Sequence, residues 1–357
     1  EVNTFNASLL WEPWEVLKKD KTPYKVFTPY YRKGCLNAKP PQTPLKAPST
    51  DTLKKPSKDT GKISDLNLLP KIQWHKDIED TWEISEQGAK ERLETFLDQE
   101  IHGYKEGRNF PSKANVSRLS PYLQSGEISP RTIWHAIQER LAVNDIPEKD
   151  ADNFMSELGW REFSYNILYH FPKLLEQPLQ ERFKTFPWQE NTQHLKAWQT
   201  GNTGYPIVDA GMRELWKTGY MHNRVRMIVG SFLVKHLLLH WHHGEKWFWD
   251  CLVDADLANN SASWQWIAGC GADAAPYFRI FNPITQGEKF DPDGEYIRKY
   301  VPELSALPDK YLNKPWEAPP LVLEGANIKL GMTYPKPIID HSFARQRALD
   351  AFQSTKT

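Results

Sequence analysis

The helical spacing of apolar residues from about residue 85 onward limits the fold of this chain more than any other feature. Ser85 is placed to cap a helix whose apolar face carries Ala89, Leu93, Phe96, Leu97 and Ile101. Ser129 and Pro130 read as an N-cap and the first helical residue of another helix. A third helix is predicted from Pro206 to Leu215, with a stop at Gly219. Because no series of strand patterns interrupts residues 85–300, we expect a mainly α fold.

Two later segments are expected to form the centre of this helical unit. Residues 223–240 are apolar on nearly every side, which is typical of a buried central helix. Residues 245–260 are predicted to form another long helix.

The first part of the chain has a different character. Residues 2–33, with the short apolar run 8–11, are interpreted as the last strand and exit of a unit that began upstream. Residues 34–70 contain six Pro and six Lys with few large apolar side chains, which is typical of a linker. We therefore divide the chain into 1–33 (end of an upstream domain), 34–80 (linker) and 81–357 (helical domain). The opening residue is Glu1 and not Met, so we expect the start of the protein to be missing.

Composition excludes several classes of protein. The 45 basic and 45 acidic residues of the 357 cancel, so any polyanionic partner must meet a local basic patch. Three Cys without a CxxC pair argue against a disulfide scaffold or a four-thiolate cluster and favour a reducing, cytoplasmic compartment. The longest apolar stretch, residues 227–234, is too short to cross a membrane. The 15 Trp residues leave two alternatives, core bulk or a specific use of indole.

A metal site and a glycine-rich nucleotide loop are both weakly supported. His236 and His240 have the four-residue spacing of metal ligands, but no third ligand follows, so we expect a His-rich helix end and no metal. The glycines at 201–204 and 269–271 lack the strand and helix that a dinucleotide-binding loop needs.

Residues 116–123 combine two hydroxyls, a guanidinium and free backbone N–H groups. Such a segment can cradle a phosphate, although Ser-Pro is also an ordinary helix start.

Residues 254–266 hold two Asp, two Asn and two Trp inside an otherwise apolar region. Buried polar groups need partners, and a bound polar heterocycle would supply them. Residues 157–163 place Trp and Arg beside two carboxylates, which fits either a ligand pocket or an interhelical ion pair. Residues 276–290 interleave aromatic and cationic side chains, as in surfaces that hold a phosphate backbone, or in a structural loop.

Taken in this order, the segments 24–32, 117–123, 160–163, 203–210, 221–227 and 254–289 resemble the cryptochrome/photolyase family. Within it they are most similar to the microbial DNA photolyases that act on cyclobutane pyrimidine dimers. The resemblance implies an upstream α/β domain, often with a folate- or deazaflavin-type antenna chromophore, and a helical domain that binds FAD. It also implies light-driven repair of UV-damaged DNA by a monomer without a membrane or protein partner.

The resemblance assigns cofactor contacts to Tyr104, Val116, Ser117, Arg118, Leu119, Ser120, Arg226, Asp254, Ala255, Asp256 and Asn260. Position 116 is commonly Thr in the family, so Val116 lacks one hydroxyl donor. Asn260 is expected to face N5 of the flavin, where plant cryptochromes tend to carry Asp.

The resemblance assigns the lesion pocket to Glu157, Trp160, Asn223, Met227 and Trp266. Photolyases flip their target out of the DNA stack, so these side chains are expected to bind the extruded dimer. The DNA-binding candidates are Arg108, Glu157, Trp160, Arg161, Asn223, Arg224, Arg279 and Gln286, with Lys289 as a further possibility.

The family mechanism implies electron transfer from reduced FAD to the dimer, splitting of the cyclobutane ring and return of the electron. Relatives often regenerate the reduced flavin through three Trp residues, which correspond to Trp188, Trp241 and Trp264.

Three alternatives remain at this point. A cryptochrome photoreceptor is disfavoured by Glu157, Trp160, Met227 and Asn260 and by the short tail. Repair of (6-4) photoproducts is disfavoured for two reasons. Those enzymes usually carry a pair of His where this chain has His222, Asn223 and Arg224. Their bacterial branch has a cluster of four Cys, which the three Cys of this chain cannot supply. A flavin-binding DNA protein without photochemistry is the third.

Overall fold

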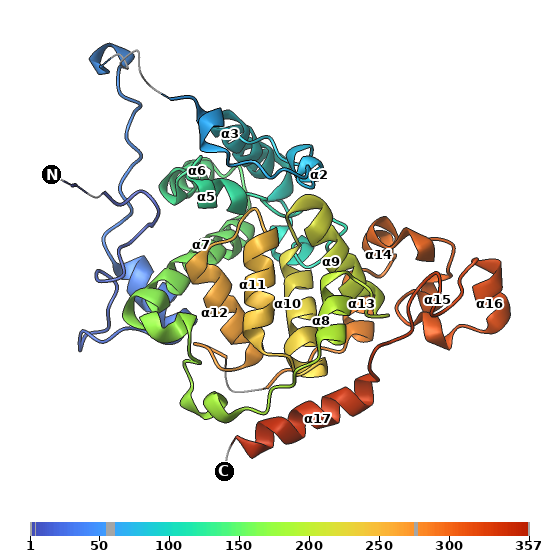
Figure 1. Cartoon of the computed structure of the whole chain (residues 1–357). Helices are drawn as coiled ribbons and strands as arrows, with labels where there is room; N and C mark the ends of the chain where they lie inside the picture. Colours follow the sequence, from blue (N-terminus) through green and yellow to red (C-terminus); the bar gives the residue numbers. More distant parts are fainter. Residues whose placement is uncertain (1, 4, 55–60, 275–277, 356–357) are drawn as a thin grey trace.

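The computed structural model of the chain describes residues 2–3, 5–54, 61–274 and 278–355. Pro276 and Tyr277 of the predicted aromatic segment lie outside the described residues, as do Glu1 and Thr4. The described residues are mainly helical, and their only β pairings are two isolated bridges, Gln189 with Leu239 and Leu330 with Tyr334. The expected fold class is therefore confirmed (Figure 1).

The helices fall into an N-terminal and a C-terminal group. The first comprises α1 (Phe27–Pro29), α2 (Lys76–Glu79), α3 (Glu86–Thr95), α4 (Tyr104–Gly107), α5 (Ser120–Ser125), α6 (Pro130–Ala142) and α7 (Glu148–His170). The second comprises α8 (Thr192–Gln199), α9 (Pro206–Thr218), α10 (Asn223–Ser231), α11 (Trp241–Cys251), α12 (Leu257–Ala268), α13 (Pro283–Phe290), α14 (Glu295–Tyr300), α15 (Asp309–Leu312), α16 (Pro320–Gly325) and α17 (His341–Ser354). Wider π-helical turns form η1 (Tyr30–Gly34), η5 (Phe96–Glu100) and η8 (Phe232–His236), and the remaining helical turns are short 3₁₀ segments.

Local signals set several helix ends as predicted. The Ser85 side chain accepts a hydrogen bond from the Gly88 N–H at 2.9 Å, and Ser129 accepts from the Thr132 N–H at 3.1 Å. Gly219 ends α9 with φ of +65°, a conformation that glycine adopts without a steric penalty. The apolar face predicted after Ser85 is fully buried.

Two hydrophobic cores lie side by side in the molecule. One packs the helices from α3 to α7 together with apolar side chains of residues 10–35. The other packs α8 to α17 around α10 and η8. Helix α12 packs against α7 and α11, so it joins the two cores (Figure 1).

The long central helix expected over residues 223–240 is shorter than predicted. Helix α10 ends at Ser231, the turn η8 follows, and Leu238 takes a left-handed φ of 53°. The carbonyl of Leu238 then accepts from the Gln189 N–H at 2.8 Å. An apolar run cannot by itself distinguish a helix from a buried extended segment, and here it contains both.

The helix expected over residues 245–260 is also wrong, because the region contains two helices. Helix α11 begins earlier, at Trp241, and ends at Cys251. Asp256 then starts α12 by accepting from the Asn259 N–H at 2.7 Å. The acidic residues that were assigned to a helix interior therefore lie in the connection between two helices.

The strand expected within residues 2–33 is absent from the described part of this segment, which contains α1 and η1 instead. The N–H groups of Leu10 and Trp11 bind the carboxylate of Glu162 at 2.9 and 3.2 Å. These two backbone N–H groups are therefore hydrogen-bonded to a side chain of α7 and not to a neighbouring strand.

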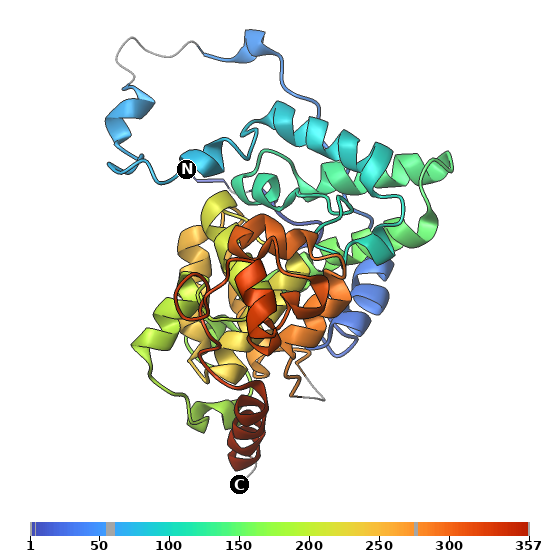
Figure 2. The ribbon, with the colours of Figure 1, turned by 90° about the vertical axis from the view of Figure 1, so that its right-hand side faces the viewer.

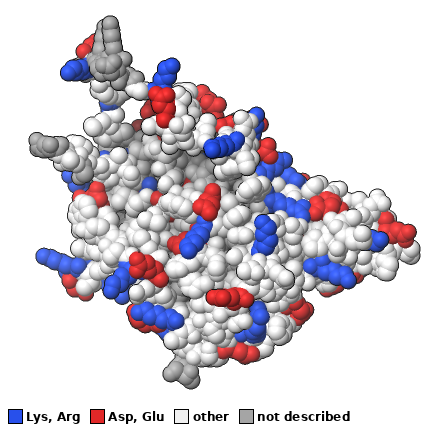
Figure 3. Space-filling view, viewed as in Figure 1, with Lys and Arg blue, Asp and Glu red and all other residues white. Residues whose placement is uncertain are grey.

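The segment that follows is mostly exposed. Most described residues between 38 and 80 have high exposure, with only short helical turns (Figure 2). Basic and acidic side chains are intermingled on the face shown in Figure 3. None of the helices in the described ranges is long and apolar enough to cross a bilayer.

Candidate flavin and lesion site

A cavity of about 550 Å³ lies between the two cores, with walls from α5, α7, α10 and α12. Every residue expected to contact the cofactor lines it: Tyr104, Val116, Ser117, Arg118, Leu119, Ser120, Arg226, Asp254, Ala255, Asp256 and Asn260. The five residues expected to shape the lesion pocket line the same cavity: Glu157, Trp160, Asn223, Met227 and Trp266. The structure therefore brings together segments that lie more than 160 positions apart in the sequence.

Asp254 is the centre of the polar wall. Its Oδ2 accepts from Arg226 Nη2 at 2.8 Å and from the Ser120 hydroxyl at 2.6 Å. Its Oδ1 is buried and has no hydrogen-bond partner among the described residues. A buried carboxylate oxygen without a partner is costly, so this atom is a clear acceptor for a ligand.

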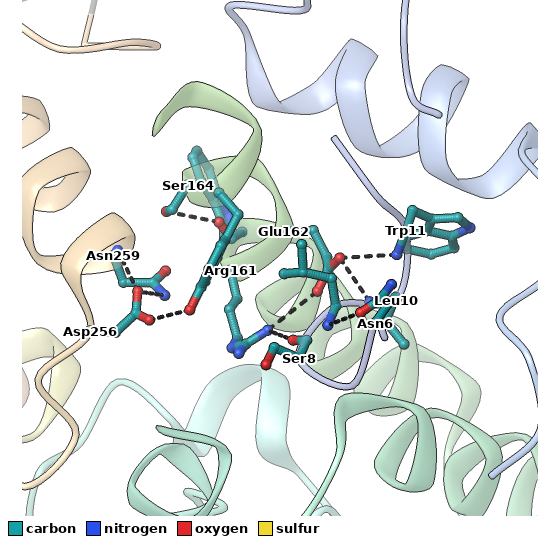
Figure 4. Close-up of polar contacts among 12 residues, drawn as sticks. Asn6, Ser8, Leu10, Trp11, Arg161, Glu162, Ser164, Asp256 and Asn259 are labelled. Carbon is teal, nitrogen blue, oxygen red and sulfur yellow. Dashed lines mark hydrogen bonds and ion pairs between the residues drawn. The ribbon is translucent and has the colours of Figure 1, made fainter. Parts of the chain in front are cut away.

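Asp256 is already engaged by the protein. Its Oδ1 accepts from the backbone and side-chain nitrogens of Asn259 at 2.7 and 2.6 Å, which caps α12. Its Oδ2 accepts from the Tyr165 hydroxyl. Figure 4 shows Asp256 and Asn259 on the α12 side, facing α7. Asp256 therefore shapes the wall mainly by fixing the start of α12.

Asn260 has one polar side-chain atom without a hydrogen-bond partner among the described residues. Its side-chain nitrogen donates to the Glu245 carbonyl at 2.9 Å, and the Glu245 side chain accepts from the Ser261 hydroxyl. The amide oxygen of Asn260 is thus left as an acceptor, which fits a donor N–H on a ligand.

The predicted phosphate segment lies beside Asp254, because the Ser120 hydroxyl donates to Asp254 Oδ2 at 2.6 Å. Arg118 has a left-handed φ of 51°, and its guanidinium lies over the rings of Trp82 and Tyr220 at 5.9 and 5.3 Å. Aromatic rings on which a guanidinium rests restrict its position while it keeps its charge. Arg226 is paired with Asp254, whereas Arg118 has no ion-pair partner among the described residues, so Arg118 is the cation available here for an anionic ligand.

Glu157 and Arg108 form an ion pair in the cavity lining. Arg108 also donates to the Asn153 side chain at 3.1 Å. Asn223 is the first residue of α10 and is exposed, and Met227 lies one turn further along the same helix. These side chains are placed to contact a ligand that enters the cavity from outside.

Other DNA-binding candidates lie outside the cavity lining. Arg224 donates to the Asn109 side chain and lies 4.4 Å from the Phe290 ring centroid. Arg279 is in the segment before α13, and its carbonyl accepts from Lys235 Nζ. Gln286 is half-buried within α13, and Lys289 is exposed near its end.

Arg161 differs from the other cationic candidates. It lines the cavity, but its Nη1 donates to the Ser8 carbonyl at 2.5 Å, and the guanidinium lies over the Tyr165 ring at 5.0 Å. Figure 4 shows Arg161 directed toward the N-terminal segment. A contact with DNA would have to compete with this arrangement.

The three Trp residues assigned to electron transfer occupy different depths. Trp264 lines the cavity, while Trp241 is fully buried and Trp188 is half-buried outside it. His240 lies between the last two, with ring centroids 5.4 Å from Trp241 and 5.2 Å from Trp188. The structure thus links Trp241 and Trp188 through an imidazole ring.

The histidine interpretation needs correction. His236 is buried in η8 and contacts Nδ1 of His341 at 2.8 Å, whereas His240 caps the start of α11 by accepting from the His242 N–H at 3.2 Å. The two histidines therefore do not share a helical face, and His240 lies at a helix N-terminus. Burial and neighbouring cations lower the pKa of His240 to about 4, so it is neutral and does not complement a C-terminal dipole. In the described ranges no group of three side chains is arranged to hold a metal ion.

Several site residues were missed by sequence reasoning. Asn259 and Ser263 line the cavity within the polar segment already singled out, so their spacing on α12 could have identified them. Gln124 and Phe154 also line it, but nothing in the sequence distinguishes them from ordinary helical residues.

The residues present fit FAD. The cavity combines the cation of Arg118, a buried acceptor at Asp254 and an acceptor amide at Asn260 with a largely apolar lining. This combination suits a ligand with a diphosphate and a flat polar heterocycle. Fold and site together define a helical flavin-binding protein.

Comparison with known proteins gives the same class. The family described as "FAD binding domain of DNA photolyase" matches residues 154–354, and "DNA photolyase" matches residues 1–49. A deoxyribodipyrimidine photo-lyase of Agrobacterium fabrum is 51% identical over 99% of this chain and 74% of its own length. Cryptochrome-1 of Arabidopsis thaliana is 38% identical over 98% of this chain and 52% of its own.

Solved structures agree with these matches. A bacterial class III photolyase from Agrobacterium tumefaciens superposes with a TM-score of 0.94 at 51% identity, covering 99% of this chain and 73% of that one. A Synechocystis cryptochrome gives 0.81 at 28% identity, covering 97% and 72%. The chain belongs to the photolyase/cryptochrome family.

Proposed function

We propose that this protein is a deoxyribodipyrimidine photo-lyase that binds FAD and repairs cyclobutane pyrimidine dimers in UV-damaged DNA under light. The observation that carries the proposal is that Asp254 and the lesion candidates Glu157 and Trp160 line the same cavity. The Oδ1 of Asp254 has no hydrogen-bond partner among the described residues. A cofactor and an extruded pyrimidine dimer would therefore be bound next to each other. The 51% identity to a photo-lyase over nearly the whole chain supports the same function.

When bound, reduced FAD supplies the light-driven electron that opens the cyclobutane ring. The residues of this chain provide binding and orientation. Asp254, held by Arg226, accepts a hydrogen bond from the cofactor, and Arg118 balances charge on its phosphates. The amide oxygen of Asn260 accepts from an N–H of the heterocycle, which favours the protonated form of that nitrogen.

The lesion side works by shape and by hydrogen bonds to base edges. Glu157 and Asn223 can bind base edges, since Glu157 shares only part of its carboxylate with Arg108. Trp160, Trp266 and Met227 pack against the extruded bases and exclude water. A dimer stacks poorly, so its extrusion from the duplex costs less than that of normal bases.

The remaining assignments belong to this proposal. Arg108, Arg161, Arg224, Arg279 and Gln286 contact the DNA backbone, and Trp264, Trp241 and Trp188 relay electrons to the flavin. An α/β domain with a folate- or deazaflavin-type antenna precedes the linker at residues 34–80, and the protein acts as a cytoplasmic monomer.

The test is repair of an oligonucleotide that carries one thymine dimer, with the FAD-loaded protein under near-ultraviolet light. Wild type should restore the thymines, and Glu157→Gln should lower the repair rate by about tenfold, the value of one lost hydrogen bond to a charged group. Glu148→Gln, exposed at the start of the same helix, is the matched control and should repair normally. Flavin binding and photoreduction without any dimer loss would instead indicate a cryptochrome.

A further inference from the structure

A stack of aromatic rings joins the N-terminal segment to the cavity wall. The rings of Phe27 in α1 and Trp160 in α7 lie face to face, with centroids 3.7 Å apart and planes 10° from parallel. Tyr31 lies nearly parallel to Phe27 at 5.7 Å. The stack therefore connects two segments that are separated by more than 120 residues.

The surrounding packing fixes this stack in one arrangement. Phe163 meets Trp160 edge-on at 5.8 Å and Phe27 at 6.0 Å. Gly159 leaves the space that Tyr31 occupies, since a Cβ at this position would lie 2.4 Å from the Tyr31 ring. Phe27 is itself buried.

The next turn of α7 also binds the N-terminal segment. Arg161 donates to the Ser8 carbonyl, and Glu162 accepts from the N–H groups of Leu10 and Trp11 (Figure 4). Consecutive residues from 159 to 162 thus each contact the segment between residues 8 and 31. The N-terminal segment therefore forms much of the surroundings of this turn of α7.

Trp160 also lines the cavity. Because Phe27 covers one face of the indole and Phe163 lies against it edge-on, only the remaining surface can meet a ligand. An indole that is already fixed loses less freedom when a base packs against it, so binding is stronger.

We propose that Phe27 is a positioning residue that holds the indole of Trp160 in the orientation required to pack against the extruded dimer. This inference rests on the proposed function for its substrate, but not for the conformational role of Phe27. The N-terminal segment is then part of the lesion site and not only a connection to an upstream domain.

The positioning role can be measured without any repair. The full-length protein is labelled with 5-fluorotryptophan, and the Trp160 signal in the ¹⁹F spectrum is assigned by its loss in Trp160→Phe. The wild type should give one narrow Trp160 line. Phe27→Leu, which keeps the apolar volume but removes the ring, should broaden or split this line, and Phe27→Tyr should restore it. An unchanged narrow line in Phe27→Leu would overturn the proposal.

Binding then tests the consequence for the substrate. Phe27→Leu should weaken binding of a dimer-containing oligonucleotide by about 3- to 10-fold, the range of one aromatic pair, and leave binding of the undamaged strand unchanged. In a Trp160→Leu background the Phe27→Leu change should add nothing, and a full additional loss would contradict the coupling. Phe171→Leu at the end of α7, whose ring contacts Lys25 and not Trp160, is the matched control. Flavin content and thermal unfolding verify that each variant is folded.

The two hypotheses fail in different ways. If the wild type neither prefers nor repairs the dimer while Phe27→Leu still broadens the Trp160 line, the proposed function is wrong and the positioning role stands. If wild type repairs the dimer and Phe27→Leu leaves both the line and the binding unchanged, only the positioning role is wrong.

Discussion

Arg226 donates a hydrogen bond from Nη2 to Oδ2 of Asp254 at 2.8 Å and leaves the second oxygen of this buried carboxylate unpartnered among the described residues. Arg226 Nε also donates to the Met221 carbonyl at 2.7 Å, so the guanidinium is fixed from two sides. The pair therefore connects the start of α10 with the connection between α11 and α12. It holds one unpartnered acceptor in place in the cavity lining, where we propose that FAD binds.

Replacing Asp254 by Asn should strongly reduce flavin binding. The amide removes the charge that balances Arg226 and replaces one acceptor by a donor. A lost hydrogen bond to a charged group corresponds to about 10- to 100-fold weaker binding. The ratio of flavin to protein absorbance after dialysis measures this, with Asp250→Asn, exposed in the last turn of α11, as control. Equal flavin content in both variants would contradict the role of Asp254.

The buried carboxyl of Glu162 should make stability depend on pH. Burial raises its pKa to about 7 from an ordinary 4.5, although Arg161 and two backbone N–H groups act in the opposite direction. Between these values the folded protein retains a proton that the unfolded chain has released. The stability that this group contributes is therefore largest near pH 4.5 and is lost as the pH rises through 7.

The variant Glu162→Gln tests this dependence because its amide stays neutral. From pH 5 to pH 8 the free energy of unfolding of the wild type should fall relative to the variant by about 2–4 kcal/mol. Urea titrations at several pH values measure the difference, with Glu148→Gln as control. A difference that stays constant with pH would show that Glu162 titrates normally.

Lys235 should give the opposite dependence at higher pH. Burial lowers its pKa to about 7 from an ordinary 10.5, with Arg279 adding to the effect and Cys270 opposing it. Above pH 7 the folded protein has lost a proton that the unfolded chain keeps, so stability rises with pH toward 10.5. Wild type should therefore gain stability relative to Lys235→Met between pH 7 and pH 9. A difference in unfolding free energy between wild type and variant that stays constant from pH 7 to pH 9 would contradict the prediction.

The sequence predicted those parts of the fold that local chemistry determines. Ser85, Ser129 and Gly219 set helix ends through their own side chain or backbone, so their patterns were sufficient. The helical run that begins with α10 ends shortly before Leu238, whose carbonyl accepts from the Gln189 N–H, and the N–H groups of Leu10 and Trp11 bind the Glu162 carboxylate. These partners are distant in the sequence, so no local pattern reveals them.

The candidate site shows the same division. Polar density at residues 254–266 and the family resemblance identified the cavity lining, because a ligand site concentrates unusual side chains. The residues that pack behind the cavity lining were not predicted. Phe27 lies in the segment 24–32, which contributes to the family resemblance, but nothing in this segment indicates a contact with Trp160.

The Trp264→Phe variant should slow photoreduction of the bound flavin by at least about tenfold. Phenylalanine is much harder to oxidise than indole, so the variant removes the first step of the proposed relay and keeps an aromatic ring next to Phe248. Flavin absorbance under blue light with an external thiol measures the rate. Trp249→Phe, which is exposed on α11, is the control. Equal rates in both variants would remove Trp264 from the electron path.

The most direct test of light-driven repair compares the dimer content of DNA after incubation with the reduced, FAD-loaded protein in the light and in the dark. Chromatography of the digested oligonucleotide should show two thymines formed for each dimer lost in the light, and no change in the dark. Asp254→Asn should lose this activity together with its flavin. If the illuminated wild type carries reduced flavin and leaves the dimer intact, the protein is not a photolyase.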